Sequence, residues 1–297
     1  MMKKFIRLLS ISMLSILTIS SCATTKKSTE EDKREKPVIL VVSFGTSYND
    51  SREKTIGAIE NKIRAAYGNE YEVRRAFTSQ FIINKLKKRD GLVIDTVDQA
   101  LQRCIDDGIK TLVVQPTHVM GGKEDDEMKK TVAQFADKFE TISIGTPLLT
   151  TEEDYEETVQ VLTRVTSSSD DGKTAIVFMG HGTTHPANST YATLQTFINR
   201  AGYGDRYFIG TVEATPTLQD MIDKVTATGF KKVVLQPFMI VAGDHANNDM
   251  AGDGDESWKT AFEKAGFQVT CVIKGLGEIP EIQDLFVKKT ADAINHL

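Results

Sequence analysis

Cysteine is scarce in this 297-residue chain, and its spacing excludes two kinds of site. There are three cysteines, Cys22, Cys104 and Cys271, and no two of them form a Cys-x-x-Cys pair. Thiol redox centres and structural zinc sites use that close spacing. The sequence therefore supports neither site, although Cys104 and Cys271 could form a disulfide in an exported protein.

Excess positive charge and the common nucleotide motifs are also missing. The formal net charge is −5, which argues against broad attraction to nucleic acid. The chain contains no Walker loop, no Gly-x-Gly-x-x-Gly fingerprint and no Gly-x-Ser-x-Gly elbow. We therefore expect no nucleic-acid partner, no nucleotide cofactor and no serine-hydrolase chemistry.

Long apolar runs are confined to the N-terminus, where residues 8–19 follow a basic start. That run is short for a membrane span, and residues 1–22 are typical of a secretory signal peptide. Ile-Ser-Ser-Cys at 19–22 resembles the bacterial lipobox, which predicts lipidation of Cys22; an ordinary signal peptide with an incidental cysteine is the alternative. Residues 23–36 are charged and read as a flexible tether. We expect an exported protein, lipid-anchored to a bacterial membrane, and Ala23 after the cysteine favours the outer membrane or a periplasm-facing site.

Strand-like and helix-like segments alternate from Pro37 onward, which indicates parallel sheets with helices on both faces. Several strands are continuous apolar runs, as expected of strands buried on both faces. The predicted strands are 38–44, 70–78, 110–115, 141–145, 174–179, 206–211, 231–237 and 267–273. The predicted helices are 52–67, 95–107 (with Asp95 as a possible N-cap), 125–139, 189–201, 217–228, 256–265 and 282–296.

The two halves of the chain repeat each other. SFGTSYNDS (43–51) resembles GHGTTHPANS (180–189), and TLVVQPTHVMGGKEDDEM (111–128) resembles KVVLQPFMIVAGDHANNDM (232–250). Parallel strands look alike in general, but the shared Gln-Pro after a strand favours gene duplication. The predicted fold class is α/β, with two duplicated Rossmann-like lobes, parallel sheets flanked by helices, and a cleft between the lobes. We place the N-terminal lobe at 37–166 and the C-terminal lobe, carrying the metal site, at 174–297.

Three side chains that can bind metal follow three successive strands of the second half. They are His181, Glu213 and His245, separated by equal intervals of 32 residues (213 − 181 and 245 − 213). Ligands of such sheets bind beyond the carboxyl ends of the strands, so all three are expected on one rim. Taken singly, each could be an ordinary loop residue. Together, two imidazoles and a carboxylate suit Co²⁺, Fe²⁺, Ni²⁺ or Zn²⁺ and leave coordination positions open.

Other residues of the same rim are weaker candidates. His185 could cap the next helix or lie at the cleft mouth, and Asp244 could orient His245. The glycine turns open helices, whose N-termini favour anions, although a tight turn that only needs glycine explains them equally well. The predicted substrate-binding residues are Ser43, Gly45, Thr46, His118, Gly182 and His185.

Five motifs together resemble the anaerobic-pathway sirohydrochlorin cobalt chelatases, a class II chelatase family with the ferrochelatase-like fold. They are VVSFGTSYNDSREKTI, PTHVMGGKEDDEM, FMGHGTTHPANSTY, GTVEATPTL and QPFMIVAGDHANNDMAGDGDESWK. The resemblance runs from Val38 to Leu297. It implies a lyase of cobalamin biosynthesis that inserts Co²⁺ into sirohydrochlorin in a cleft between two lobes. It also implies that His181 is the catalytic histidine and a metal ligand, that Glu213 assists catalysis, and that Glu213 and His245 complete the metal site.

Export leaves a second hypothesis open. Corrin synthesis is cytoplasmic, so a lipid-anchored chelatase would act on exported or scavenged tetrapyrrole. The alternative is a haem-binding lipoprotein of iron acquisition, built on the chelatase fold, with His181 or His245 as axial ligand. In either case we expect a tetrapyrrole partner, a divalent metal as substrate (Co²⁺ first, Fe²⁺ or Ni²⁺ as alternatives) and a homo-oligomer as one option.

Overall fold

The computed structural model describes residues 36–297. The predicted signal peptide, Cys22 and all of the tether except Lys36 lie outside these residues. Within the described part of the chain, no helix has both the length and the apolar character needed to cross a membrane.

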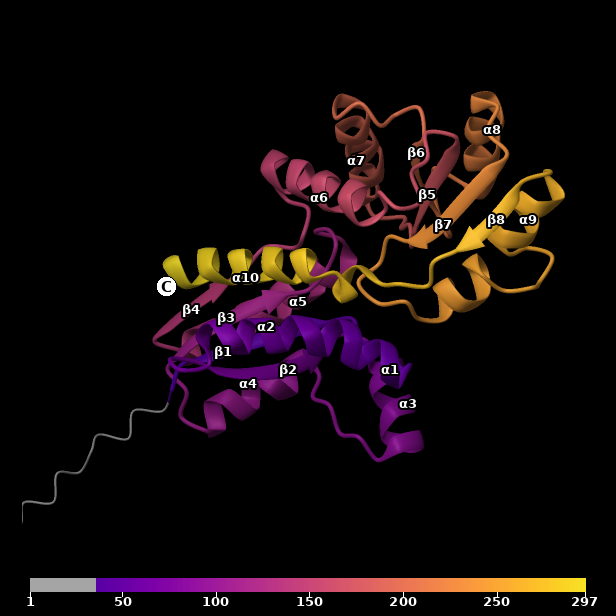
Figure 1. Ribbon diagram of the computed structural model, residues 1–297. Helices are drawn as coiled ribbons and strands as arrows, with labels where there is room; N and C mark the ends of the chain where they lie inside the picture. The colour runs from indigo at the N-terminus through magenta and orange to yellow at the C-terminus, as the bar shows by residue number, and fades with distance from the viewer. Residues whose placement is uncertain (1–35) are drawn as a thin grey trace, which may run out of the picture. The chain divides into compact units, whose positions relative to one another are not determined.

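The first sheet is parallel, with strand order β2-β1-β3-β4 (Figure 1). Its strands are β1 (Val38–Ser43), β2 (Glu72–Phe77), β3 (Thr111–Pro116) and β4 (Thr141–Ile144). All six residues of β1 are buried, as its uninterrupted apolar sequence predicts for a central strand covered on both faces.

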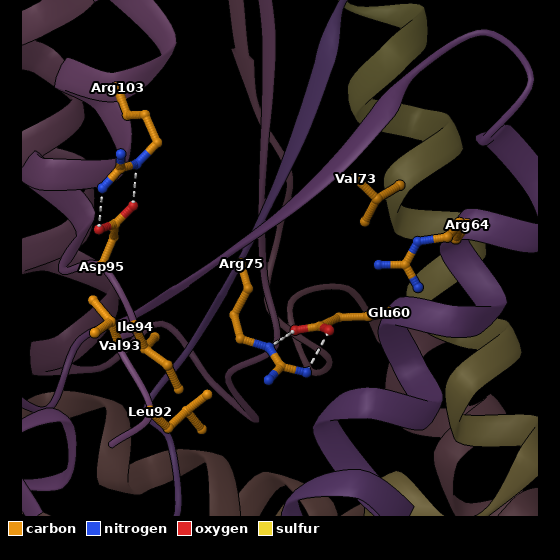
Figure 2. A pocket seen from close by; sticks show the side chains of 9 residues that line it. All are labelled: Glu60, Arg64, Val73, Arg75, Leu92, Val93, Ile94, Asp95 and Arg103. Atoms are coloured by element: carbon orange, nitrogen blue, oxygen red, sulfur yellow. Dashed lines mark hydrogen bonds and ion pairs between the residues drawn. The ribbon is translucent and has the colours of Figure 1, made fainter. Parts of the chain in front are cut away.

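Helices cover both faces of this sheet. They are α1 (Asn49–Arg52), which continues through the π-helical turn Glu53–Gly57 into α2 (Ala58–Tyr67), then α3 (Gln80–Asp90), α4 (Val97–Asp106) and α5 (Lys123–Phe135), which ends in the 3-10 turn Ala136–Lys138. Glu60 of α2 forms a double hydrogen bond with the guanidinium of Arg75 on β2 (Figure 2). The prediction of Asp95 as N-cap was wrong, because Thr96 caps α4 in a capping box with Gln99.

The second sheet repeats the first, with parallel strand order β6-β5-β7-β8. Its strands are β5 (Thr174–Gly180), β6 (Tyr207–Thr211), β7 (Lys232–Pro237) and β8 (Gln268–Cys271). Its helices are α7 (Ser189–Arg200), α8 (Leu218–Thr228) and α9 (Trp258–Lys264), with 3-10 turns at Pro186–Asn188 and Leu276–Glu278 and a π-helical turn at Ala246–Met250. The predicted α/β class with two parallel sheets is confirmed.

The lobes exchange a helix, which was not predicted from the sequence. Helix α6 (Glu152–Val165) follows the first sheet in the sequence but packs on α7, where Tyr155 stacks on Phe197 with ring centroids 5.2 Å apart. Helix α10 (Pro280–Asn295) follows the second sheet but packs on α2 and β3 of the first (Figure 1). Each lobe is therefore completed by a helix from the other half of the chain.

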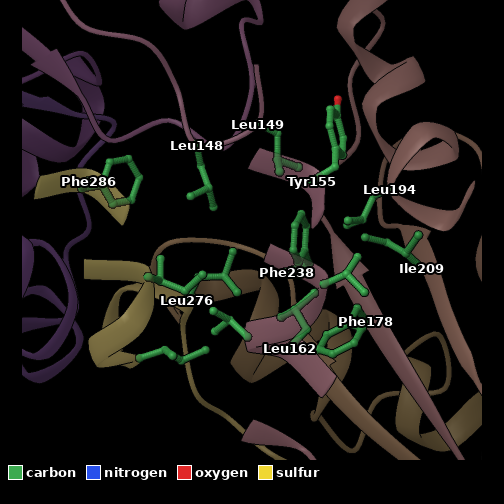
Figure 3. Packing of buried hydrophobic residues seen from close by; sticks show 14 of the residues in the cluster. Leu148, Leu149, Tyr155, Leu162, Phe178, Leu194, Ile209, Phe238, Leu276 and Phe286 are labelled. Atoms are coloured by element: carbon green, nitrogen blue, oxygen red, sulfur yellow. The ribbon is translucent and has the colours of Figure 1, made fainter. Parts of the chain in front are cut away.

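One apolar cluster joins the two lobes. It contains Leu148, Tyr155 and Phe286 together with Phe178 and Phe238 of the second lobe (Figure 3). Its members come from both sheets and from both exchanged helices. The two halves of the chain thus share a core, and the described residues form one compact unit.

The two cysteines of the described residues are free thiols, so the disulfide considered above is not formed. Cys104 is buried on α4 of the first lobe, and Cys271 lies on β8 of the second. Burial raises the pKa of both thiols, which disfavours the reactive thiolate.

Candidate metal centre

Three loops at the carboxyl ends of β5, β6 and β7 bring the predicted ligands together. His181 follows β5 directly, Glu213 lies two residues after β6, and His245 immediately precedes the π-helical turn after β7. One donor atom from each residue lies within 4.8 Å of the other two. Ligands of one ion at about 2.1 Å can be at most about 4.2 Å apart, so a small inward movement would suffice to bind a metal.

Glycine makes the close approach of the first two loops possible. Gly182 has a φ of +85°, and a Cβ there would lie 2.8 Å from the Ala214 nitrogen. Across this contact, Glu213 N donates to His181 O at 2.9 Å. Gly182 N donates in turn to the hydroxyl oxygen of buried Tyr191 at 3.2 Å. The loops are thereby fixed to each other and to α7, and the role found for Gly182 is one of backbone geometry.

Both imidazoles have an acceptor beside Nδ1. His181 Nδ1 lies 2.8 Å from Gly182 O, and His245 Nδ1 lies 2.6 Å from a carboxylate oxygen of Asp249. A carbonyl or carboxylate oxygen can only accept, so the proton of each neutral ring belongs on Nδ1. The lone pair of Nε2 is then free on both histidines, which is the form that binds a metal or takes up a proton.

The three side chains are accessible to a ligand. The exposed fractions of the side chains are 48% for His181, 55% for Glu213 and 31% for His245. The two imidazole rings meet edge to face with centroids 4.6 Å apart, and a Glu213 oxygen lies 3.8 Å from His181 Nδ1. A set of two neutral nitrogens and one anionic oxygen can hold a borderline divalent cation while leaving room for further ligands.

Asp249, not Asp244, orients His245, so the prediction for Asp244 was wrong. Asp244 instead accepts hydrogen bonds from the Tyr48 hydroxyl at 3.2 Å and from Asn248 at 2.9 Å. Asp249 lies four residues after His245, and the π-helical turn places its carboxylate beside the ring. A carboxylate behind a ligating histidine fixes the ring and its tautomer.

His185 does two things at the lobe boundary. Its Nδ1 accepts from Ala187 N at 3.1 Å, so it caps the following turn as one of its two predictions stated. Its Nε2 lies 3.3 Å from an Asp126 oxygen in the first lobe. The Tyr48–Asp244 hydrogen bond runs between the lobes in the opposite direction, from the residue of the first repeat that is equivalent to His185. Two pairs thus connect the rims of the lobes.

His118 is not part of the three-residue cluster. It is largely buried, and its Nδ1 lies 3.7 Å from a carboxylate oxygen of the fully buried Asp125. Burial would raise the pKa of Asp125, but contacts with His118 and with Lys129, whose Nζ is 2.6 Å away, outweigh it and lower that pKa. His118 thus lies beside the Asp125–Lys129 pair inside the first lobe, and its binding of substrate stays a prediction.

The remaining predicted substrate-binding residues make internal contacts. Ser43 Oγ lies 2.7 Å from Thr117 Oγ1, and both residues are buried. Gly45 has a φ of +100°, and a Cβ there would meet the Phe77 ring at 2.6 Å. Thr46 Oγ1 accepts from Tyr48 N at 3.2 Å. These contacts account for the residue types at the turn, and substrate binding by Ser43, Gly45 and Thr46 stays a prediction.

Comparison with known proteins decides the family. A family model described as cobalt chelatase (CbiK) matches residues 37–295. The chain belongs to this cobalt chelatase family. It is 40% identical over 260 residues to the sirohydrochlorin cobaltochelatase of Salmonella typhimurium, covering 88% of this chain and 97% of the relative. It is 31% identical over 268 residues to the sirohydrochlorin cobaltochelatase CbiKC of Nitratidesulfovibrio vulgaris, covering 88% and 92%. The predicted family and the prediction of a chelatase enzyme are confirmed.

Solved structures of distant chelatases share the fold. SirB from Bacillus subtilis with Fe³⁺ superposes with a TM-score of 0.62 at 14% identity, covering 88% of this chain and 97% of that chain. CbiX, described as the terminal enzyme for siroheme biosynthesis in denitrifying bacteria, gives a TM-score of 0.52 at 13% identity, covering 86% and 99%. These structural similarities support the fold described above. At such low sequence identity they say nothing about the roles of individual residues.

Proposed function

We propose that this protein is a sirohydrochlorin cobaltochelatase in which His181, Glu213 and His245 hold the incoming Co²⁺. The observation that carries the proposal is the meeting of these three donors within 4.8 Å on the rim of the second sheet. The identity to two cobaltochelatases over nearly their whole length supports the reaction and the substrate. The metal is a substrate here, so a site with open coordination positions suits delivery to a macrocycle.

The reaction exchanges two protons for one cation without any redox change. Sirohydrochlorin loses two pyrrole N–H protons, Co²⁺ forms bonds to the ring nitrogens, and two protons are released. The Nε2 lone pair of His181 cannot bind metal and proton together. We propose that it first binds Co²⁺ and, as a ring nitrogen displaces it, accepts a pyrrole proton. The exposed Glu213 carboxylate accepts the second proton and passes it to water.

A cobalt-insertion assay tests this proposal. Purified protein is mixed with sirohydrochlorin and Co²⁺, and cobalt-sirohydrochlorin is followed by visible absorbance. We expect catalytic turnover that is lost in His181→Ala and in His245→Ala and kept in His296→Ala, which removes an exposed imidazole at the C-terminus. Full turnover in both ligand variants would refute the assignment of the metal site.

The haem-carrier alternative predicts a different result when the same protein variants are also mixed with haem. A haem carrier would show a Soret shift that depends on His181 or His245 and no cobalt insertion. The pair of imidazoles with an adjacent carboxylate favours delivery of a small cation over axial ligation of a haem that already holds its metal.

We further propose that the chelatase is exported and lipid-anchored through Cys22. The basic start, short apolar run and lipobox-like 19–22 support this setting. Labelling of growing cells with a clickable fatty acid tests it. The label is expected on the wild-type protein and absent from Cys22→Ala; an unlabelled wild type would contradict the anchor.

A further inference from the structure

The outer edges of the two sheets differ in a way that the chelatase reaction does not explain. In a parallel ladder, alternate residues of a strand direct their backbone groups to opposite sides. Glu72 N donates to Pro37 O, and Thr78 N donates to Ser43 O, so even-numbered residues of β2 face β1. Odd-numbered residues of β2 therefore face outward. The same alternation holds on β6, where Val212 N donates to Gly180 O.

The outward backbone groups of β6 form hydrogen bonds with other parts of the second lobe. The side chain of Gln195 on α7 donates to Tyr207 O at 3.0 Å and accepts from Ile209 N at 3.1 Å. Further along the edge, Thr211 N donates to Pro216 O at 2.7 Å. A single amide side chain thus replaces a neighbouring strand, and this edge is not available for pairing.

Most of the outward backbone groups of β2 have no such partners among the described residues, so this edge is open. Phe77 N donates to Asp95 O at 3.0 Å, but the outward backbone groups of Val73 and Arg75 have no hydrogen-bond partner among residues 36–297. Glu60 on α2 does not close the edge as Gln195 does, because both of its oxygens bind the Arg75 guanidinium at 2.7 Å. That pair also folds the Arg75 charge back onto α2, so the charge does not shield the edge.

A groove of about 480 Å³ runs along this open edge. Figure 2 shows α2 with Glu60 and Arg64 on one side, and Asp95 with Arg103 on the other. A second groove of about 440 Å³ continues past Asp95 and Arg103. Neither groove shares a residue with the metal centre. The groove lies between α2 on one side and residues 92–95 with Arg103 of α4 on the other, along the open edge of β2. An open strand edge at the floor of a groove has the form of a site for strand addition.

The residues that line the groove indicate the chemistry of a molecule that could bind there. Val93 is 69% exposed and offers an apolar contact beside the strand. Arg75 and Arg103 are neutralised by Glu60 and Asp95, whereas the Arg64 guanidinium donates to Asn61 Oδ1 and has no carboxylate partner in the described part of the chain. An occupant with an extended backbone, a carboxylate for Arg64 and an apolar side chain for Val93 satisfies all three features.

We propose that the open edge of β2 binds an extended acidic peptide segment of a partner protein, which adds a fifth strand to the first sheet. The backbone of Val73 and Arg75 supplies the hydrogen bonds, and Arg64 selects an acidic side chain. This site is separate from the metal centre, so its occupation docks the chelatase to a partner without entering the reaction.

A fluorescein-labelled peptide, Thr-Val-Glu-Val-Glu-Thr, tests the proposal by fluorescence anisotropy with the purified protein. Two N-methylated versions, one on the odd and one on the even amides, each remove hydrogen bonding along one edge of the peptide. Only one edge can pair with β2, so one version should lose at least about tenfold in affinity and the other should bind normally. Replacing both Glu residues of the peptide by Lys should also abolish binding.

Two protein variants complete the test. Val73→Pro removes an outward N–H that makes no bond to β1, and it should abolish binding while cobalt insertion is unchanged. Arg64→Glu should weaken binding by about fivefold or more, whereas Arg200→Glu, in the last turn of α7 beside the closed edge, should not. If Val73→Pro does not fold, the N-methylated peptides and Arg64→Glu decide. Absence of binding at millimolar peptide, or equal binding of both N-methylated versions, would overturn the proposal.

Discussion

The two lobes share a backbone plan and differ in the side chains that it presents. Ser79 N donates to Phe44 O in the first lobe as Glu213 N donates to His181 O in the second. Phe44 and Ser79 therefore stand where the second lobe has a metal-binding imidazole and carboxylate. The loop geometry is common to both lobes, so it does not by itself make a metal site.

The third position shows the same relation. Asp126 N donates to Gly122 O, and Asn247 N donates to Gly243 O, which places Glu124 where the second lobe has His245. The first lobe thus keeps one potential ligand of three, and the cluster found among residues 36–297 lies entirely in the second lobe. The two lobes thus present equivalent rims, and a few side chains distinguish the rim that carries the cluster.

The largest expected effect is on cobalt insertion, when His181 is replaced by phenylalanine, the residue at the equivalent position of the first lobe. His181→Phe removes the proposed ligand and proton acceptor, and cobalt insertion should fall by roughly 10²–10⁴-fold. The exposed position should leave the thermal unfolding temperature nearly unchanged. The reciprocal Phe44→His should neither raise turnover nor rescue the first variant. Retention of more than a tenth of the turnover in His181→Phe would contradict this division of labour.

A buried ion pair joins the two exchanged helices, and breaking it should have the next largest effect. Lys289 Nζ of α10 lies 2.8 Å from an Asp154 oxygen of α6, with both side chains nearly buried. Lys289→Met leaves that carboxylate buried without its cation and should lower the free energy of unfolding by about 3 kcal/mol in urea titrations. Lys62→Met, which breaks the exposed pair with Asp284 on the same helix, should cost less than about 1 kcal/mol. Equal losses would refute the role of burial.

The same pair gives a dependence of stability on pH. Burial would raise the pKa of Asp154, but the hydrogen bond from Lys289 and those from the backbone of Thr150 and Thr151 outweigh it and lower that pKa below 3.8. A carboxylate with a lowered folded-state pKa stabilises the fold above its unfolded-state pKa, and this stability is lost as the pH falls below about 4. Urea titrations between pH 5 and pH 2.5 should show this loss in the wild type and a smaller one in Asp154→Asn.

The carboxylate behind His245 should affect metal binding more weakly than a ligand does. The first lobe has one residue fewer between Gly122 and Met128 than the second has between Gly243 and Met250, and its helix α5 is regular there. The extra residue accompanies the π-helical turn that carries Asp249. Asp249→Asn should weaken Co²⁺ binding by about 10–100-fold in a visible absorption titration, while Asp253→Asn, at an exposed ion pair, should not. Unchanged affinity in Asp249→Asn would exclude it as a positioning residue.

The smallest expected effect is on stability, when the outer edge of β6 loses the side chain that hydrogen-bonds to it. Gln195→Ala leaves Tyr207 O and Ile209 N without their partner, as in β2, and should cost about 1 kcal/mol of unfolding free energy. Hydrogen exchange of the Ile209 amide should become as fast as that of Arg75. Gln219→Ala on α8, whose side chain donates a hydrogen bond to exposed Asp223 one turn away, serves as control. A protected Ile209 amide in Gln195→Ala would show that the side chain does not close the edge.

The parts of the fold that the sequence predicted are those with strong local signals. The run VILVVS and its counterparts form central strands, and the equal spacing of His181, Glu213 and His245 follows from one ligand per βα unit. Helix α3 was missed because it is mostly polar and buries only Ile83 and Leu86. Asp249 was missed because HANNDM, rich in asparagine, gives no helical pattern that would place it one turn after His245.

The exchange of α6 and α10 could not be predicted because an apolar helix face does not specify which sheet it covers. Tyr155 and Phe286 would fit a core in either lobe by composition alone. Their placement is decided by the whole assembly of the shared cluster. The open edge of β2 was hidden for a similar reason, since it depends on whether Glu60 reaches a backbone group or the side chain of Arg75.

The exchanged helices also determine what would happen if the chain were cut. The connection 167–173 is largely exposed, and a protease that cleaved there would leave each fragment holding a helix that completes the other. The two fragments would stay associated, whereas either half expressed alone would lack part of its core.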